Sequence, residues 1–281
     1  MKLQELWKFG QTYLKDKGIA DYQADARFLL CHMLQKDPSY LVLHGKEEAD
    51  QEEVYLALLE QRAAGVPLQY ILGETEFMSL KFFVDESVLI PRQETELLVE
   101  FVIGQMKNHK TPKILDLCTG SGCIAISLAK YLPGSDVYGA DISMDALNVA
   151  VKNEELHDVN VKFYQEDVRS PFMQFWDLDA VVSNPPYIPT NVIPTLQREV
   201  KDREPISALD GGADGLNFYR SISPLAYSYL KPGGLIAFEI GWDQSIGVSE
   251  ILHKNGFENV QTIKDYSGLD RIVWAMKNQT E

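Results

Sequence analysis

A strand that runs into a glycine-rich turn is indicated by residues 113–122, Lys113-Ile114-Leu115-Asp116-Leu117-Cys118-Thr119-Gly120-Ser121-Gly122. From here on, apolar strand patterns alternate with helical patterns. The strand candidates are residues 113–118, 136–142, 161–167, 178–184, 234–240, 259–266 and 271–277. Buried strands that alternate with helices predict a doubly wound, Rossmann-like α/β sheet that binds its ligands at the carboxyl ends of the strands. The short turn at Ser267-Gly268-Leu269 makes the last two strands an antiparallel pair.

Three segments are indicated along the chain. Residues 1–67 have apolar side chains at helical spacing and predict a small helical bundle suited to substrate recognition. Residues 68–90 alternate between apolar and polar side chains, which suggests a β-hairpin linker. Residues 91–281 form the α/β domain, which carries the chemistry.

The composition of the 281 residues is that of an ordinary globular protein, with 45% hydrophobic and 24% charged residues and a net charge of −15. Such an acidic chain repels bulk nucleic acid, because affinity for phosphate backbones rests mainly on Lys and Arg. No signal peptide or membrane-spanning run is evident. The three cysteines form neither a disulfide framework nor a zinc pattern, so we expect reduced thiols and no metal site. We also expect a cytoplasmic monomer that does not bind membranes.

A nucleoside site is predicted at the glycine-rich turn, Cys118-Thr119-Gly120-Ser121-Gly122. Such a turn lets a ligand approach the backbone and offers it the amides of a helix N-terminus. Two acids at strand ends sharpen the prediction: Asp141 is placed to accept both ribose hydroxyls, and Asp167, beside Val168, to bind the edge of an adenine. The three spaced glycines of the dinucleotide fingerprint are not met cleanly here.

The chemistry is predicted at Asn184-Pro185-Pro186-Tyr187, at the end of the fourth strand candidate. Two consecutive prolines stiffen the loop and leave carbonyls without amide hydrogens. Asn184 adds a side-chain acceptor and Tyr187 a flat aromatic face. Two acceptors and a stacking ring suit a planar NH₂ group, whose nitrogen they hold toward an electrophilic methyl group. We assign Asn184, Pro185, Pro186 and Tyr187 to catalysis, and expect Asn184 to border the cofactor as well.

Together, these two motifs resemble those of class I amino methyltransferases, which have a seven-stranded sheet. Within that class the chain is similar, over nearly its whole length, to the release factor glutamine methyltransferases (the PrmC/HemK family). Further matching segments are Leu89-Ile90-Pro91-Arg92, Thr95-Glu96, Arg203-Glu204-Pro205, Ala208-Leu209, Gly211-Gly212-Ala213-Asp214-Gly215, Phe238-Glu239-Ile240-Gly241, Asp265-Tyr266-Ser267-Gly268 and Arg271.

The resemblance implies transfer of a methyl group from S-adenosylmethionine to the glutamine of the Gly-Gly-Gln loop in class 1 peptide-chain release factors. It implies that residues 118–122, Asp141 and Val168 hold the cofactor and that residues 184–187 hold the glutamine. One departure stands out, because the family usually has glycine where this chain has Cys118.

Three alternatives remain open at this point. The same loop serves the exocyclic amines of DNA or RNA, although the charge of −15 opposes such a partner. A glutamine in a ribosomal protein is a second possible substrate, and a non-catalytic cofactor-binding module is a third interpretation. The charged residues Arg92, Glu96, Arg203 and Glu204 have two interpretations: they order residues 188–216 or contact the partner, or they form structural ion pairs.

Overall fold

The computed structural model describes residues 1–170 and 175–279. The chain divides into two compact units. The helical unit comprises Met1–Glu74 with Gln197–Arg203, and the sheet unit comprises Thr75–Leu196 with Glu204–Glu281. No helix among the described residues has the length and apolar character needed to cross a membrane.

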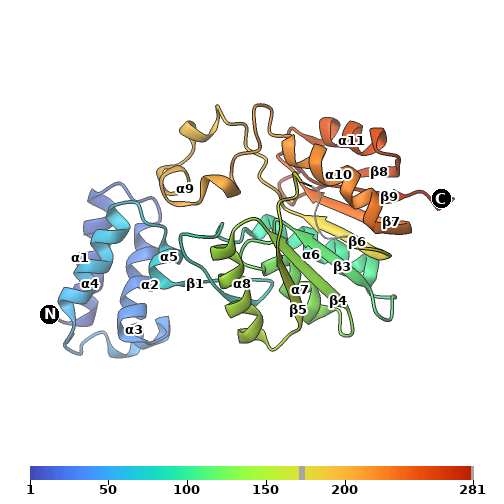
Figure 1. The fold of residues 1–281 in the computed structure, drawn as a ribbon. Coiled ribbons are helices and arrows are strands. Elements are labelled where there is room, and N and C mark those ends of the chain that lie inside the picture. Colours follow the sequence, from blue (N-terminus) through green and yellow to red (C-terminus); the bar gives the residue numbers. More distant parts are fainter. Residues whose placement is uncertain (171–174, 280–281) are drawn as a thin grey trace. The chain divides into compact units, whose positions relative to one another are not determined.

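In the helical unit, which Figure 1 shows at the N-terminal end of the chain, all helices but the last pack side chains into one apolar core. Its helices are α1 (Leu3–Asp16), α2 (Tyr22–Leu34), α3 (Pro38–His44), α4 (Glu52–Ala63), α5 (Leu68–Leu72) and α9 (Arg198–Arg203). Leu14, Leu29 and Tyr55 are fully buried in this core, and the Tyr55 hydroxyl donates to the Ala26 carbonyl at 2.8 Å. The buried Arg62 guanidinium bonds to Asp25 at 2.6 Å and to Glu199 at 2.7 Å, which joins α2, α4 and α9.

The hairpin is shorter than the sequence pattern suggested. Its strands are β1 (Glu74–Phe77) and β2 (Leu80–Phe83), whereas the start of the segment 68–90, predicted as a hairpin linker, is helix α5 (Leu68–Leu72). Leu68, Ile71 and Leu72 form helix α5 because their three- and four-residue spacing lets them pack together on the helical core. Gly73 ends this helix with a φ of 73°.

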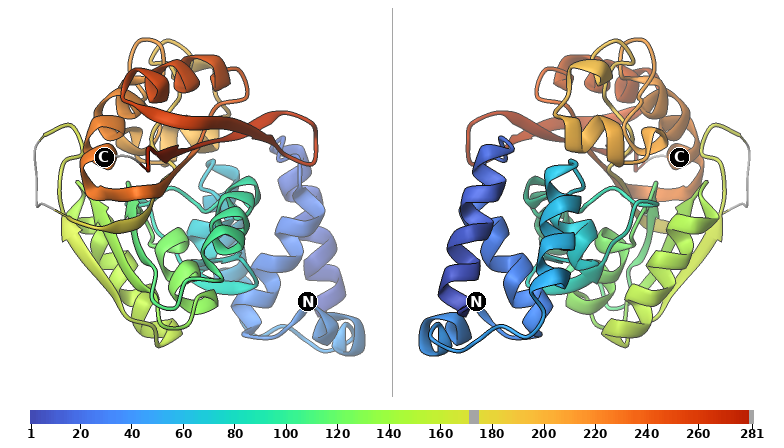
Figure 2. Two further views of the ribbon diagram at one scale, coloured as in Figure 1. Left: turned by 90° about the vertical axis from the view of Figure 1, so that its right-hand side faces the viewer. Right: turned by 90° about the vertical axis from the view of Figure 1, so that its left-hand side faces the viewer.

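The sheet unit contains a seven-stranded sheet, as predicted, with the order β5-β4-β3-β6-β7-β9-β8. Its strands are β3 (Lys113–Leu117), β4 (Asp136–Asp141), β5 (Val161–Gln165), β6 (Leu178–Ser183), β7 (Leu230–Glu239), β8 (Phe257–Lys264) and β9 (Asp270–Lys277). The five strands from β3 to β7 are parallel, and β9 runs antiparallel to both β7 and β8, which confirms the predicted terminal pair. Figure 2 shows β8 and β9 as a long ribbon.

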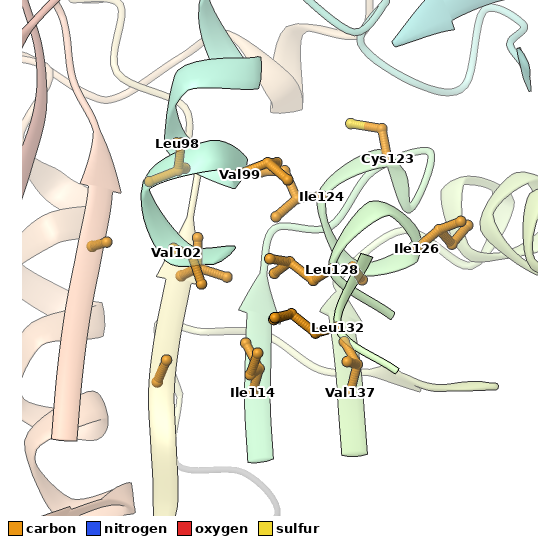
Figure 3. Close-up of a cluster of buried hydrophobic side chains, with 14 of the residues drawn as sticks. Leu98, Val99, Val102, Ile114, Cys123, Ile124, Ile126, Leu128, Leu132 and Val137 are labelled. Carbon is orange, nitrogen blue, oxygen red and sulfur yellow. The ribbon is translucent and has the colours of Figure 1, made fainter. Parts of the chain in front are cut away.

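Helices cover both faces of this sheet, which explains why β3 and β6 are buried almost throughout. The helices are α6 (Gln93–Met106), α7 (Cys123–Tyr131), α8 (Met144–His157), α10 (Asn217–Tyr229) and α11 (Ser245–Lys254), with short 3₁₀ turns at Ile193–Thr195 and Ile206–Ala208. On one face, α6 and α7 pack side chains such as Val102 and Leu128 against Ile114 (Figure 3). On the other face, α10 and α11 bury Tyr219 and Val248 against Phe238.

The chain order reverses between β3 and β6, the two neighbouring strands from which the sheet grows outward in opposite directions. Leu117 pairs with Ser183 at their ends, and the Ser183 hydroxyl donates to the Leu117 carbonyl at 2.6 Å. The loops that begin at Cys118 and Asn184 therefore leave the sheet side by side. Such a reversal is the usual ligand site of an open α/β sheet.

Candidate active site

A cavity of about 360 Å³ opens at this reversal point, within the size range of small-molecule sites. Of the predicted site residues it is lined by Cys118, Gly120, Asp141, Asp167, Val168, Asn184 and Pro186. Further lining comes from Ser87–Leu89, Ile142, Ser143, Ala146, Glu166, Arg169, Pro205–Ala208, Asp210, Gly212, Asn217 and Phe218. The sheet thus brings together both predicted motifs in one cavity.

Five predicted residues do not line the cavity: Thr119, Ser121, Gly122, Pro185 and Tyr187. The buried Thr119 hydroxyl donates to Asp116, and burial raises the pKa of the Asp116 carboxyl to about 7. Gly122 precedes α7 with a φ of 79°, and a β-carbon there would lie 2.9 Å from the Ile126 side chain. Thr119 and Gly122 therefore support the glycine-rich turn without lining the cavity.

Asp141 is held at the end of β4 by two backbone donors. Its Oδ2 accepts from the Gly120 amide and its Oδ1 from the Ser143 amide, both at 2.9 Å. Burial raises the pKa of this carboxyl. Each oxygen retains acceptor capacity toward the cavity, because a carboxylate has about four lone-pair sites.

Asp167 and Val168 stand in the loop after β5, which ends at Gln165. Arg169 binds the Asp167 carboxylate at 2.9 and 3.0 Å and lowers its pKa. Asp167 is therefore an ionised acid whose position is fixed at the cavity wall. The Val168 side chain is buried.

The loop after β6 is held by contacts on several sides. The Asn184 Nδ2 group donates to the Thr95 hydroxyl oxygen at 3.2 Å, and the Gln244 Nε2 group donates to the Tyr187 carbonyl at 2.9 Å. The Tyr187 hydroxyl lies 3.4 Å from Glu239 Oε1. Gly215 passes so close that a β-carbon there would lie 2.3 Å from the Tyr187 carbonyl oxygen. A residue larger than glycine at position 215 would displace the loop.

The segment after Glu204 is joined to this loop by backbone hydrogen bonds. Ile188 donates to the Leu209 carbonyl at 3.0 Å and accepts from the Gly211 amide at 2.9 Å. At the start of the segment, the Arg92 guanidinium binds both oxygens of the buried Glu204 at 2.7 Å. This ion pair anchors the segment that supplies Pro205–Ala208 to the cavity wall.

Glu96 and Arg203, the other two charged residues with two interpretations, also have structural partners. Glu96 Oε1 accepts from the Met78 amide at 2.7 Å, and the Arg203 guanidinium donates to the Ala64 carbonyl at 3.2 Å. Neither lines the cavity. Among the residues that the structure describes, no group of three or more His, Cys, Asp or Glu side chains is placed to hold a metal ion.

Sequence reasoning assigned no role to Thr95, Glu239 or Gln244, although the first two fall within the motifs quoted above. Glu239 is 1% exposed, and burial raises the pKa of its carboxyl to about 7. One sequence feature indicates a role for Glu239: it stands near the carboxyl end of the apolar strand 234–240, the same kind of position as that of Asp141.

The chain matches two family models, the PrmC N-terminal domain over residues 5–73 and the Methyltransferase small domain over residues 93–197. It is 41% identical to a release factor glutamine methyltransferase of Clostridium acetobutylicum, over 99% of either chain. It is 42% identical to that of Clostridium botulinum, over 99% of this chain and 100% of the relative. The chain belongs to the release factor glutamine methyltransferase family.

Two solved methyltransferase structures share the fold over most of the chain. A 16S rRNA methyltransferase of T. thermophilus, in complex with AdoMet and guanosine, aligns with a TM-score of 0.52 and 17% identity. The alignment covers 73% of this chain and 50% of that one. A methyltransferase of Pyrococcus furiosus gives the same two values over 72% of this chain and 91% of its own. Both likenesses concern the fold alone.

Cys118 has a backbone φ of 60°, a conformation that favours glycine. A side chain there costs about 1–2 kcal/mol, against about 0.5–1 kcal/mol for the extra chain entropy that glycine loses on folding. We therefore expect Cys118→Gly to leave the free energy of unfolding unchanged or to raise it by up to about 1 kcal/mol, with turnover retained. Urea unfolding and a methyl-transfer assay test this. A collapse of activity in a folded variant would show that the thiol is required.

Proposed function

We propose that this chain transfers the methyl group of S-adenosylmethionine to the side-chain amide nitrogen of the glutamine in the Gly-Gly-Gln motif of class 1 release factors. One observation carries the proposal. The Asn184 amide uses its NH₂ group on Thr95, so its oxygen is the group left for the cavity, next to Pro186. An oriented acceptor at this place suits a substrate NH₂ group.

The loop supplies orientation more than chemical activation. An amide nitrogen is a weak nucleophile because its lone pair is delocalised into the carbonyl. Asn184 Oδ1 and a loop carbonyl each take one of its hydrogens, and the Tyr187 ring stacks against the amide plane. These contacts point the nitrogen at the methyl group and offset the positive charge that develops on it. S-adenosylmethionine supplies the electrophilic methyl group.

The cavity fits that cofactor by the chemistry of its walls. Asp141 presents a carboxylate of fixed orientation for the ribose hydroxyls, beside the turn at Gly120. Asp167 and Val168 line the cavity after the neighbouring strand β5, where an adenine edge needs an acceptor and an apolar neighbour. Asn184, at the border of the same cavity, meets both the cofactor and the glutamine.

Asp141→Ala should weaken the binding of S-adenosylmethionine by about 10- to 100-fold, since hydrogen bonds to a charged group contribute about 1.5–3 kcal/mol. Isothermal titration calorimetry measures this directly. Asp145→Ala is the matched control: it removes an equal charge four residues away, from an exposed side chain outside the cavity. Equal dissociation constants for the two variants would refute the ribose contact.

The substrate assignment is tested by incubating the protein with labelled S-adenosylmethionine and a purified release factor, then locating the methyl group by mass spectrometry. We expect one methyl group on the Gly-Gly-Gln glutamine and none on a release factor with alanine in its place. Parallel samples contain ribosomal proteins or nucleic acid. Labelling of either, with the release factor unmodified, would overturn the proposal and favour the corresponding alternative.

The proposed enzyme works as a single chain, because one copy supplies all the residues that we assign to cofactor and glutamine. Its acidic charge suits a protein partner better than direct nucleic-acid binding. A release factor as substrate places the reaction in the cytoplasm, where translation ends.

A further inference from the structure

We propose that Thr95 and Glu239 are positioning residues, which fix the side-chain amide of Asn184 with its oxygen toward the substrate. This inference rests on the proposed function, because it concerns the same glutamine site. Neither residue lines the cavity, so both act through Asn184.

The first contact is between Asn184 and Thr95. Thr95 lies in the first turn of α6, where its side chain is almost fully buried, at 2% exposure. Its hydroxyl oxygen accepts from Asn184 Nδ2 at 3.2 Å. The hydroxyl has one proton of its own, which requires an acceptor in this buried place.

Glu239 is the acceptor that we assign to this proton. Its carboxylate is buried at the end of β7 and interacts with the Thr95 hydroxyl, which lowers its pKa against the larger effect of burial. Its buried Oε2 atom forms no hydrogen bond with the described residues, so its lone pairs are available for the Thr95 proton. A carboxylate cannot donate, and the proton of Thr95 must therefore point toward Glu239 and its lone pairs toward Asn184.

This order of donors decides which way the amide of Asn184 points. With the nitrogen on Thr95, the oxygen faces the cavity as an acceptor. In the flipped amide, oxygen would meet oxygen unless the Thr95 proton turned away from Glu239, which would leave a buried carboxylate without that donor. A flipped amide would also present hydrogens to the hydrogens of the substrate.

A purely structural role for Glu239 would place it in an ion pair. Arg271 is the nearby cation, and its charge favours the ionised form of Glu239. The Arg271 guanidinium instead bonds to Asp265, at 3.1 and 3.4 Å. Glu239 interacts instead with the hydroxyl groups of Thr95 and Tyr187, of which the second lies 3.4 Å from Oε1, and these contacts favour a role in the site.

Two substitutions of Thr95 separate positioning from packing. Thr95→Val keeps the shape without the hydroxyl, so kcat should fall about 10-fold or more, as for the loss of one buried hydrogen bond, with affinity for S-adenosylmethionine within about 2-fold. Thr95→Ser keeps the hydroxyl but loses a buried methyl group, so its melting temperature should fall while kcat stays within about 3-fold. An active valine variant, or a serine variant that loses as much kcat as valine, would overturn the inference.

The pH profile of kcat is the second measurement. Protonated Glu239 no longer offers two acceptor oxygens, so wild-type kcat should decline as the pH falls through about 7. Glu239→Gln should lower kcat and remove this decline. The titratable groups that interact with Glu239 are Tyr187, Tyr219, Cys123, Arg271 and Glu94, and the buried Asp116 also has a pKa of about 7. A decline that persists in Glu239→Gln would belong to Asp116 and would overturn the role of Glu239.

Wild-type protein is measured in every series on the same release factor. If the wild type leaves the glutamine unmodified, the proposed function fails. If the wild type methylates it and Thr95→Val does so equally fast, only the positioning role fails. Should Thr95→Val not fold, the Thr95→Ser and Glu239→Gln results still decide the inference.

Discussion

Asn184→Ala is expected to reduce turnover by about 10²–10³-fold, the usual loss when one preorganised polar contact is removed at a reacting centre. The substitution removes the acceptor for one hydrogen of the substrate amide and leaves the Thr95 hydroxyl without its donor. Cofactor affinity should change far less, because Asp141 and the Gly120 turn remain intact. Single-turnover rates with a saturating release factor measure the effect on the chemical step.

Asn191→Ala is the matched control for this experiment, because it is the same substitution seven residues away at an exposed side chain. Its turnover should equal that of the wild type within about twofold. Normal turnover of Asn184→Ala would mean that the loop is an inert proline turn, and the amide-clamp mechanism would have to be abandoned.

Two substitutions of Tyr187 should separate the contribution of its ring to turnover from that of its hydroxyl group. Tyr187→Ala removes the stacking surface and should lower turnover by about 10²-fold, since stacking on an aromatic side chain contributes about 1–3 kcal/mol. Tyr187→Phe keeps the ring and loses only a 3.4 Å contact with Glu239, so its turnover should stay within about threefold. Steady-state assays of the two variants test this. Similar losses in both would assign the effect to the hydroxyl and contradict the stacking role.

The fold was predictable because its central strands are nearly continuous apolar runs. Residues 178–184 are one such run, and the observed strand β6 is buried from Leu178 to Ser183. Parallel strands, once recognised, place the loops after Leu117 and Ser183 at one edge of the sheet. That argument predicts that Asp141 and Asn184 lie close together, and the cavity includes both.

Other features depended on tertiary packing that one sequence does not display. Residues 70–73 alternate locally, but Leu68, Ile71 and Leu72 pack on the helical core, and that packing favours a helix. The contact from Asn184 to Thr95 spans 89 residues, so no spacing rule indicates it. The cavity wall at Pro205–Ala208 depends on the ion pair between Arg92 and Glu204, 112 residues apart.

Cys118 has a consequence for self-modification of the enzyme. A thiolate is the most nucleophilic group that this cavity could contain, and an electrophilic methyl donor beside it would alkylate it. Burial, together with the negative charge of Asp141, raises the pKa of this thiol well above its ordinary value. The sulfur therefore stays protonated at neutral pH and leaves the methyl group for the glutamine. Burial is thus the main protection of the enzyme against methylating itself, and the acids that we assign to the cofactor add to it.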